Sequence, residues 1–257
     1  MTTRARTFQA TVADREVLSP HLVRLRLAGL GDFASSGVPD EWVGLVVPGQ
    51  YQSRYYTVRS FDGALMELDV VVHDVGLVTE WASRDCRGDV VTLTEPRGSF
   101  TLPEDAGWLM LVGDLTAMPA MARITETVTD LPTRVWAEVP DDLAGYLPDA
   151  TDVTWLTPPR GGGSRLAEVV EGLDWPEGPG YFWMAGESAQ MRAIRKFLMR
   201  GRRMPASSYD VMGYWRGVKE RQPRAVDPGP IWRAGKAAGK SDEEIWADYD
   251  RAREEMP

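Results

Sequence analysis

Trp108-Leu109-Met110-Leu111-Val112-Gly113-Asp114 divides this chain of 257 residues into two kinds of sequence. An apolar run closed by Gly-Asp is typical of a strand that is buried on both faces of a parallel sheet. Downstream of it, apolar patterns predict helices at 119–128, 164–171 and 188–200, and strands at 133–139, 152–156, 181–185 and 209–214. We therefore expect an open parallel sheet whose binding crevices lie at the carboxyl ends of its strands.

Upstream of Trp108 the sequence is typical of short strands separated by turns. Strands are predicted at 22–27, 44–47, 54–59, 65–73 and 89–94, with one helix at 77–84. Many short strands joined by Gly-containing turns indicate a small antiparallel β-barrel or β-sandwich. The expected fold class is therefore β plus α/β. An antiparallel β-barrel domain is expected over residues 1–103, an open parallel-sheet domain over 104–217, and a tail over 218–257 that ends in a charged helix.

The composition restricts the chemistry. Asp and Glu number 38 against 29 Lys and Arg, a net charge of −9, so we expect no nucleic-acid partner. One cysteine, Cys86, and two histidines exclude a disulfide framework, a cysteine-ligated iron–sulfur cluster and an all-Cys/His zinc site. Redox chemistry would therefore use an organic cofactor, and no metal site is expected. Residues 1–13 are polar and no stretch could span a bilayer, so we expect a cytoplasmic protein without membrane insertion.

The charge is unevenly distributed along the chain. Residues 200–240 contain ten Lys or Arg and three acidic residues, whereas residues 241–257 contain seven acidic residues and two arginines. A basic segment attached to an acidic body favours an anionic ligand or partner near that segment. The alternative is a solvated face that only neutralises the acidic body.

The segment Arg54-Tyr55-Tyr56-Thr57-Val58-Arg59 carries the most specific local pattern. Side chains alternate along a strand, so Arg54, Tyr56 and Val58 share one face, and Tyr55, Thr57 and Arg59 share the other. A guanidinium beside an aromatic ring on one face can bind a phosphate and stack a planar ring system. The alternative is a solvated barrel strand whose aromatic residues only fill space.

Arg54-x-Tyr56-Thr57-x-Arg59 resembles the RxYTxR motif of the siderophore-interacting protein family, the ferric-siderophore reductases of the ferredoxin–NADP reductase-like superfamily. Further stretches resemble the family's motifs in the same order, and the resemblance extends over about residues 5 to 217. These stretches are His73-Asp74-Val75-Gly76-Leu77-Val78-Thr79-Glu80-Trp81-Ala82, Gly113-Asp114-Leu115-Thr116-Ala117-Met118-Pro119-Ala120, Trp183-Met184-Ala185-Gly186-Glu187 and Gly213-Tyr214-Trp215-Arg216.

The resemblance implies FAD bound on the barrel and an NAD(P)H-binding-like sheet domain. It places Tyr56 against the flavin ring, Thr57 at the reactive edge, and Arg54 and Arg59 at the phosphates and ribityl chain. A helix that begins at Gly76 would present backbone N–H groups to the pyrophosphate. The complete set of implied cofactor-binding residues is Arg54, Tyr56, Thr57, Val58, Arg59, His73, Gly76, Leu77, Val78, Thr79, Thr116, Ala117, Tyr214 and Trp215.

The implied function is that of an FAD-dependent ferric-siderophore reductase. Electrons would pass from NAD(P)H or reduced ferredoxin through the flavin to siderophore-bound iron(III), and iron(II) would be released. No catalytic side chain is expected beyond the flavin itself. Arg216 and Lys219 would attract an anionic ferric siderophore. The alternatives are a flavin reductase of the same architecture with another acceptor, and a non-catalytic siderophore or flavin binder.

Overall fold

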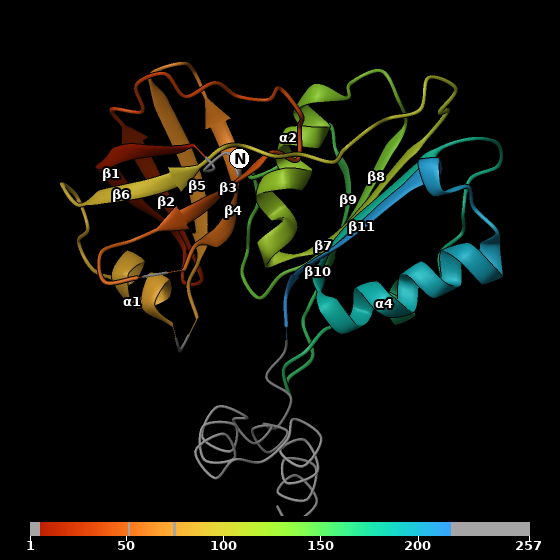
Figure 1. The fold of residues 1–257 in the computed structure, drawn as a ribbon. Helices are drawn as coiled ribbons and strands as arrows, with labels where there is room; N and C mark the ends of the chain where they lie inside the picture. The colour runs from red at the N-terminus through yellow and green to blue at the C-terminus, as the bar shows by residue number, and fades with distance from the viewer. Residues whose placement is uncertain (1–5, 51, 74–75, 217–257) are drawn as a thin grey trace, which may run out of the picture. The chain divides into compact units, whose positions relative to one another are not determined.

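The computed structural model describes residues 6–50, 52–73 and 76–216 (Figure 1). Its N-terminal part is a closed antiparallel barrel with the strand order β1-β2-β5-β4-β3-β6. The strands are β1 (Thr7–Ser19), β2 (Leu22–Ala28), β3 (Trp42–Val46), β4 (Arg54–Phe61), β5 (Leu65–Val71) and β6 (Val90–Thr94), and the helix α1 (Leu77–Ser83) follows β5. The expected antiparallel barrel and its helix are confirmed.

Apolar residues at alternate positions of the strands fill the barrel core. In β2, Val23, Leu25 and Leu27 are buried, whereas Arg24 and Arg26 lie on the outer face. The long strand β1 was absent from the elements expected from the sequence. Its outer face carries charged side chains, and these pair with Arg26 of the neighbouring β2.

The C-terminal part is a five-stranded parallel sheet with the order β11-β10-β7-β8-β9. Its strands are β7 (Leu109–Asp114), β8 (Thr133–Glu138), β9 (Asp152–Leu156), β10 (Tyr181–Glu187) and β11 (Tyr209–Trp215). Leu109 and Leu111 pack into one core cluster and Met110 and Val112 into another. The central strand β7 is therefore buried on both faces, as its continuous apolar run predicted.

Helices cover both faces of this sheet. The helix α2 (Met118–Thr127) packs on one face, while α3 (Leu166–Glu171) and α4 (Ser188–Lys196) pack on the other. The predicted helix 188–200 ends earlier as an α-helix, because the chain continues from Phe197 to Arg202 as a π-helical turn. No helix among the described residues is long and apolar enough to cross a membrane.

Polar contacts join the barrel to the sheet part. The helix α2 lies between them (Figure 1), and its Arg123 donates a 2.7 Å hydrogen bond to the carbonyl of Val58 in β4. The segment between β8 and β9 contributes two further contacts. Asp141 accepts hydrogen bonds from Ser19 and His21 of the β1–β2 turn, and the Tyr146 hydroxyl donates to Asp69 in β5.

The described residues belong to one compact unit, Met1–Arg216. The last barrel strand ends at Thr94 and the first sheet strand begins at Leu109, on either side of the domain boundary that the sequence predicts. That boundary stays a prediction. The tail over 218–257, including its predicted charged helix, lies outside the described residues.

Candidate functional site

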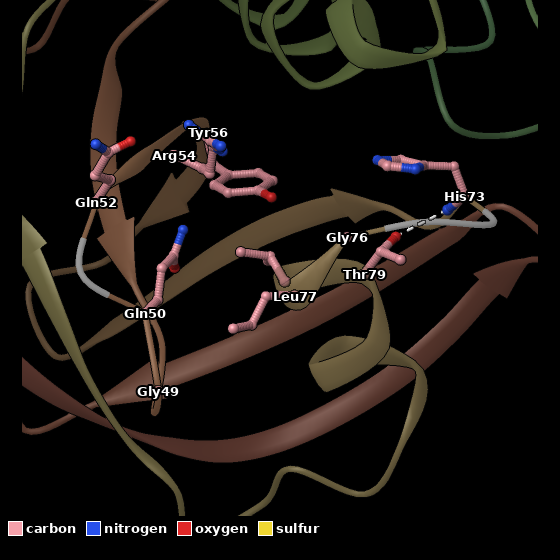
Figure 2. Close-up of a pocket in the computed structure, with 10 residues that line it drawn as sticks. Gly49, Gln50, Gln52, Arg54, Tyr56, His73, Gly76, Leu77 and Thr79 are labelled. Atoms are coloured by element: carbon pink, nitrogen blue, oxygen red, sulfur yellow. Dashed lines mark hydrogen bonds between the residues drawn. The ribbon is translucent and has the colours of Figure 1, made fainter. Parts of the chain in front are cut away.

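A cavity of about 610 Å³ opens between strand β4 and the start of α1. Figure 2 shows Arg54 and Tyr56 on one side of it, with Gly76, Leu77 and His73 across from them. The complete lining is Gly49, Gln50, Gln52, Arg54, Tyr56, His73, Gly76, Leu77, Val78 and Thr79. The structure therefore brings together two motifs that the sequence places about twenty residues apart. Gly49, Gln50 and Gln52 were not predicted, although the Pro48-Gly49 turn just before the motif marks where they lie.

Two side chains of β4 give this cavity its chemistry. Arg54 is exposed, and none of the described acidic side chains forms an ion pair with it. Its guanidinium is thus available for a phosphate group. Tyr56 is partly buried, and burial raises the pKa of its hydroxyl to about 12, while the nearby Arg54 slightly opposes this. The phenol therefore stays neutral near pH 7 and can present its ring to a planar ligand.

The start of α1 forms the opposite wall. Gly76 has a φ of 140°, which favours glycine, and a Cβ at this position would lie 3.5 Å from Cε1 of His73. The Thr79 hydroxyl accepts a 2.8 Å hydrogen bond from the backbone N–H of His73 and donates to the Val71 carbonyl at 3.4 Å. Thr79 thus links α1 to the end of β5, and the first residues of α1 lie beside the cavity.

These residues fit the phosphate and ring portions of FAD. An exposed arginine, an aromatic ring and a glycine-opened helix start converge on one cavity of suitable size. Arg54, Tyr56, His73 and residues 76–79 are therefore brought together as the sequence predicts.

Arg59 and Val58 lie away from this cavity. The Arg59 guanidinium makes two hydrogen bonds, of 3.0 and 2.6 Å, to the carboxylate of Glu126 at the end of α2. Val58 is fully buried, and its backbone carbonyl accepts from Arg123. Neither residue lines this cavity, because α2 packs against β4 and its Glu126 carboxylate pairs with Arg59. Their assignment to the cofactor stays a prediction.

A second cavity, of about 530 Å³, lies between the barrel and the edge strand β11. Tyr56 lines both cavities, and Thr57 and Tyr214 line the second. Burial raises the pKa of the Tyr214 hydroxyl far above its ordinary value. The nearby Thr57 lowers this pKa in part. Among the described residues, no group makes a hydrogen bond of ordinary geometry to the Tyr214 hydroxyl.

The carboxyl end of the sheet is organised by Asp114, a residue that was not assigned a role from the sequence. Its carboxylate accepts hydrogen bonds from the Thr116 backbone N–H at 2.9 Å and from the Trp215 indole N–H at 2.6 Å. Burial raises the pKa of Asp114, and the Thr116 and Trp215 hydrogen bonds oppose this rise. Gly186 leaves room for this carboxylate, because a Cβ there would lie 2.5 Å from it. In the sequence, Gly113-Asp114 directly after the apolar run of β7 marks the position of Asp114 at this end of the sheet.

The remaining predicted residues lie close to this end of the sheet. Thr116 and Ala117 form the short 3-10 turn between β7 and α2, and Ala117 is fully buried. Tyr214 and Trp215 end β11, and Arg216 follows them as an exposed residue. Lys219 lies outside the described residues.

Comparisons with known proteins match both parts of the chain. The model of the siderophore-interacting FAD-binding domain matches residues 50–100, which contain the residues of the first cavity from Gln50 onward. The model of the siderophore-interacting protein family matches residues 106–217. FAD is therefore the cofactor that the matched domain and the lining residues support.

The mycobactin import ATP-binding/permease protein IrtA of Mycobacterium tuberculosis is 31% identical over 87% of this chain, and the chain spans 28% of that protein's length. The ferric vibriobactin reductase ViuB of Vibrio cholerae is 31% identical, with 66% of each chain covered. The crystal structure of a siderophore utilization protein from T. fusca is 28% identical, with a TM-score of 0.71 over 83% of this chain and 94% of that chain. The barrel and sheet form the fold that ferredoxin reductases also have. The chain belongs to the siderophore-interacting protein family.

Proposed function

We propose that this chain is an FAD-dependent ferric-siderophore reductase. The observation that carries the proposal is the first cavity, where Arg54, Tyr56 and the glycine-opened start of α1 meet within the region matched by the FAD-binding domain. A relative named as a ferric vibriobactin reductase supports the class of reaction. The proposed donor is NAD(P)H, with reduced ferredoxin as the alternative. Because pyridine nucleotides are reduced inside cells, the proposed location is the cytoplasm.

The bound flavin supplies the conversion of a two-electron donation into single-electron transfers. Oxidation of one NAD(P)H to NAD(P)⁺ would release one proton and reduce two ferric chelates to the ferrous state. Iron(II) binds more weakly than iron(III) to hard anionic oxygen ligands, so it would leave the chelate.

The chain's own residues would bind and orient the reactants. Arg54 would hold a phosphate, and the neutral Tyr56 ring would cover one face of the flavin. Thr116 and Ala117 lie at the carboxyl end of β7, where a dinucleotide phosphate would bind. Trp215, tied to Asp114, would shield the reacting centre. Arg216, together with Lys219, would attract the anionic chelate.

The test is an anaerobic absorbance assay on the FAD-loaded full chain. NADPH or NADH is added first, and then a ferric chelate with a ferrous-specific trap. The expected result is bleaching of the flavin, followed by its reoxidation with trapped iron(II). Arg54→Gln should lower FAD affinity, whereas Arg87→Gln, on an exposed turn, is the matched control.

Each of the other outcomes identifies which part of the proposed function is wrong. A protein that binds no FAD contradicts the cofactor site. A flavin that neither nucleotide reduces contradicts NAD(P)H as the donor and favours ferredoxin. A reduced flavin that the ferric chelate leaves reduced contradicts the acceptor and favours a reductase of another substrate.

A further inference from the structure

The exposed side of α4 and of the π-helical turn that follows it is uniformly basic. Between Glu187 and Asp210 the sequence contains six Lys or Arg residues and no Asp or Glu, in a chain whose net charge is −9. These six residues, here called the basic face, are all exposed. They are Arg192, Arg195, Lys196, Arg200, Arg202 and Arg203.

The fold explains why these cations are exposed, but not why they are gathered. Met191, Ile194 and Leu198 are buried against the sheet, so the positions between them point outward. Arg192 and Lys196 lie four residues apart on α4, and like charges at this spacing destabilise a helix. The gathering of positive charge is therefore not a requirement of packing, and it favours a role in binding.

Most of these cations have no countercharge within the described part of the chain. Arg195 donates a hydrogen bond to the Val211 carbonyl, and the guanidinium carbon of Arg202 lies 4.4 Å from the centre of the Trp175 ring. The other four form no ion pair with any described carboxylate, and they are Arg192, Lys196, Arg200 and Arg203. Unpaired cations that lie this close together create a positive potential that attracts a polyanionic surface.

The basic face lies apart from the first cavity. The helix α4 packs on the sheet face that α3 also covers, whereas α2 covers the opposite face and contacts the barrel (Figure 1). Arg195 lines the second cavity, and none of the other five cations lines either cavity. A large anionic surface bound to the basic face would therefore leave the first cavity open.

The composition of the basic face fits lipid headgroups better than the surface of a partner protein. The core of a protein–protein interface is apolar and rich in aromatic residues. Among the described residues of α4 and its π-helical turn, the only large hydrophobic side chain that is exposed is Met199, at 60%. A lipid surface needs no such core, because each Lys or Arg gains from the negative potential of an anionic leaflet, and clusters of about four to eight cations bind it.

We propose that the basic face binds the anionic headgroups of a membrane surface, with Met199 at the level of the headgroups. The protein would then lie on the membrane without crossing it. This inference goes beyond the proposed function and does not depend on it, because no residue of the basic face lines the first cavity.

The test is co-sedimentation of the full chain, with FAD present, with two kinds of lipid vesicle. One kind contains phosphatidylcholine alone, and the other contains about one third of the anionic lipid phosphatidylglycerol. The parent should sediment only with the anionic vesicles. Raising the NaCl concentration from about 0.1 M to about 0.5 M should lower its partition coefficient at least about 10-fold, because salt screens the attraction.

The informative variants are the double variant Arg192→Gln/Lys196→Gln and the single variant Met199→Ser. The double variant should weaken partition into anionic vesicles roughly 10- to 30-fold, as expected for the loss of two cations at the membrane. Met199→Ser should weaken it roughly 2- to 5-fold, because an apolar contact with the headgroup region is lost.

The matched control is the double variant Arg6→Gln/Arg87→Gln. It removes two exposed arginines of the barrel part, so it changes the net charge of the chain by the same amount. Its partition coefficient should change less than about 2-fold, because salt screens charges that lie far from the membrane. Circular dichroism and the FAD dissociation constant check that each variant folds as the parent does.

Several results would overturn the inference while the proposed function stands. A parent that sediments with neither kind of vesicle, or equally with both, does not recognise anionic lipid. Equal losses in Arg192→Gln/Lys196→Gln and in the control would show that only the net charge matters.

Poly-L-glutamate serves as a second probe, in place of an acidic protein. Binding of poly-L-glutamate by the parent but not by Arg192→Gln/Lys196→Gln, without binding to anionic vesicles, would assign the basic face to an acidic protein partner and overturn the lipid assignment. If the double variant does not fold, Met199→Ser and the choice between the two kinds of vesicle still decide the question.

Discussion

Replacing Tyr146 with phenylalanine tests the contact between the β8–β9 segment and the barrel. The Tyr146 hydroxyl donates to Asp69, whose side chain is fully buried and also accepts hydrogen bonds of 2.7 and 2.8 Å from Arg24. The guanidinium carbons of Arg24 and Arg59 lie 6.0 and 5.6 Å from the centre of the Tyr146 ring. Phenylalanine keeps the ring, so the variant removes only the hydroxyl.

A hydrogen bond to a charged acceptor contributes about 1.5–3 kcal/mol. Because Asp69 keeps both bonds from Arg24, the lower part of this range applies, about 1.5–2 kcal/mol. For a chain of this size that loss lowers the melting temperature by roughly 3–8 °C.

The measurement is the thermal unfolding of the FAD-free full chain at pH 7, followed by circular dichroism. Tyr55→Phe is the matched control, because it removes an exposed tyrosine hydroxyl and should change the melting temperature by less than about 1 °C. A melting temperature of Tyr146→Phe within 1 °C of the parent would show that the hydroxyl contact with Asp69 contributes nothing to stability.

Three further predictions concern the cofactor turn, the α2 contact and pH. Gly76→Ala strains a backbone with φ 140°, at a cost of about 1–3 kcal/mol. It should raise the FAD dissociation constant roughly 10-fold in a fluorescence titration, and an unchanged dissociation constant would contradict the assignment of the first cavity to FAD. Arg123→Met leaves the Val58 carbonyl without its 2.7 Å partner and should cost about 1.5–3 kcal/mol in urea unfolding, and an unchanged midpoint would refute this. Burial raises the pKa of Asp141, but hydrogen bonds from Ser19 and His21 bring this pKa below its ordinary 3.8. The ionised Asp141 therefore stabilises the fold above about pH 4, and this stabilisation is lost as the pH falls. Asp141→Asn should therefore show a shallower acid destabilisation than the parent, and identical acid profiles would exclude this role.

The parts of the fold with regular apolar patterns were predictable. The run from Trp108 to Val112 marked the central strand, and β9 was predicted with the bounds that the structure has. The strand β1 was not predicted, because Asp14, Arg15 and Glu16 interrupt its apolar alternation. These charged residues fit into the strand because they have partners elsewhere in the chain, such as Arg26 in β2. Only the three-dimensional structure shows such partners.

The same limit applies to the candidate site. Alternation along β4 correctly separated Arg54 from Arg59, and the structure places only Arg54 at the first cavity. The competing carboxylate of Glu126 is 67 residues away in the sequence, so no local pattern could reveal it. The second cavity was missed for a similar reason, because Trp42 and Arg97, which also line it, come together only through barrel closure.

Helix α2 and the β8–β9 segment both make hydrogen bonds to the barrel. These contacts limit how the barrel and the sheet could be exchanged with those of related proteins. A barrel transplanted without its own sheet domain would carry the Val58 carbonyl without Arg123, Arg59 without its carboxylate, and Asp69 without the Tyr146 hydroxyl. A foreign sheet domain would have to supply all three partners at matching positions. Chimaeras that exchange the barrel and the sheet should therefore fold well only when α2 and the β8–β9 segment are transferred together with the barrel that they contact.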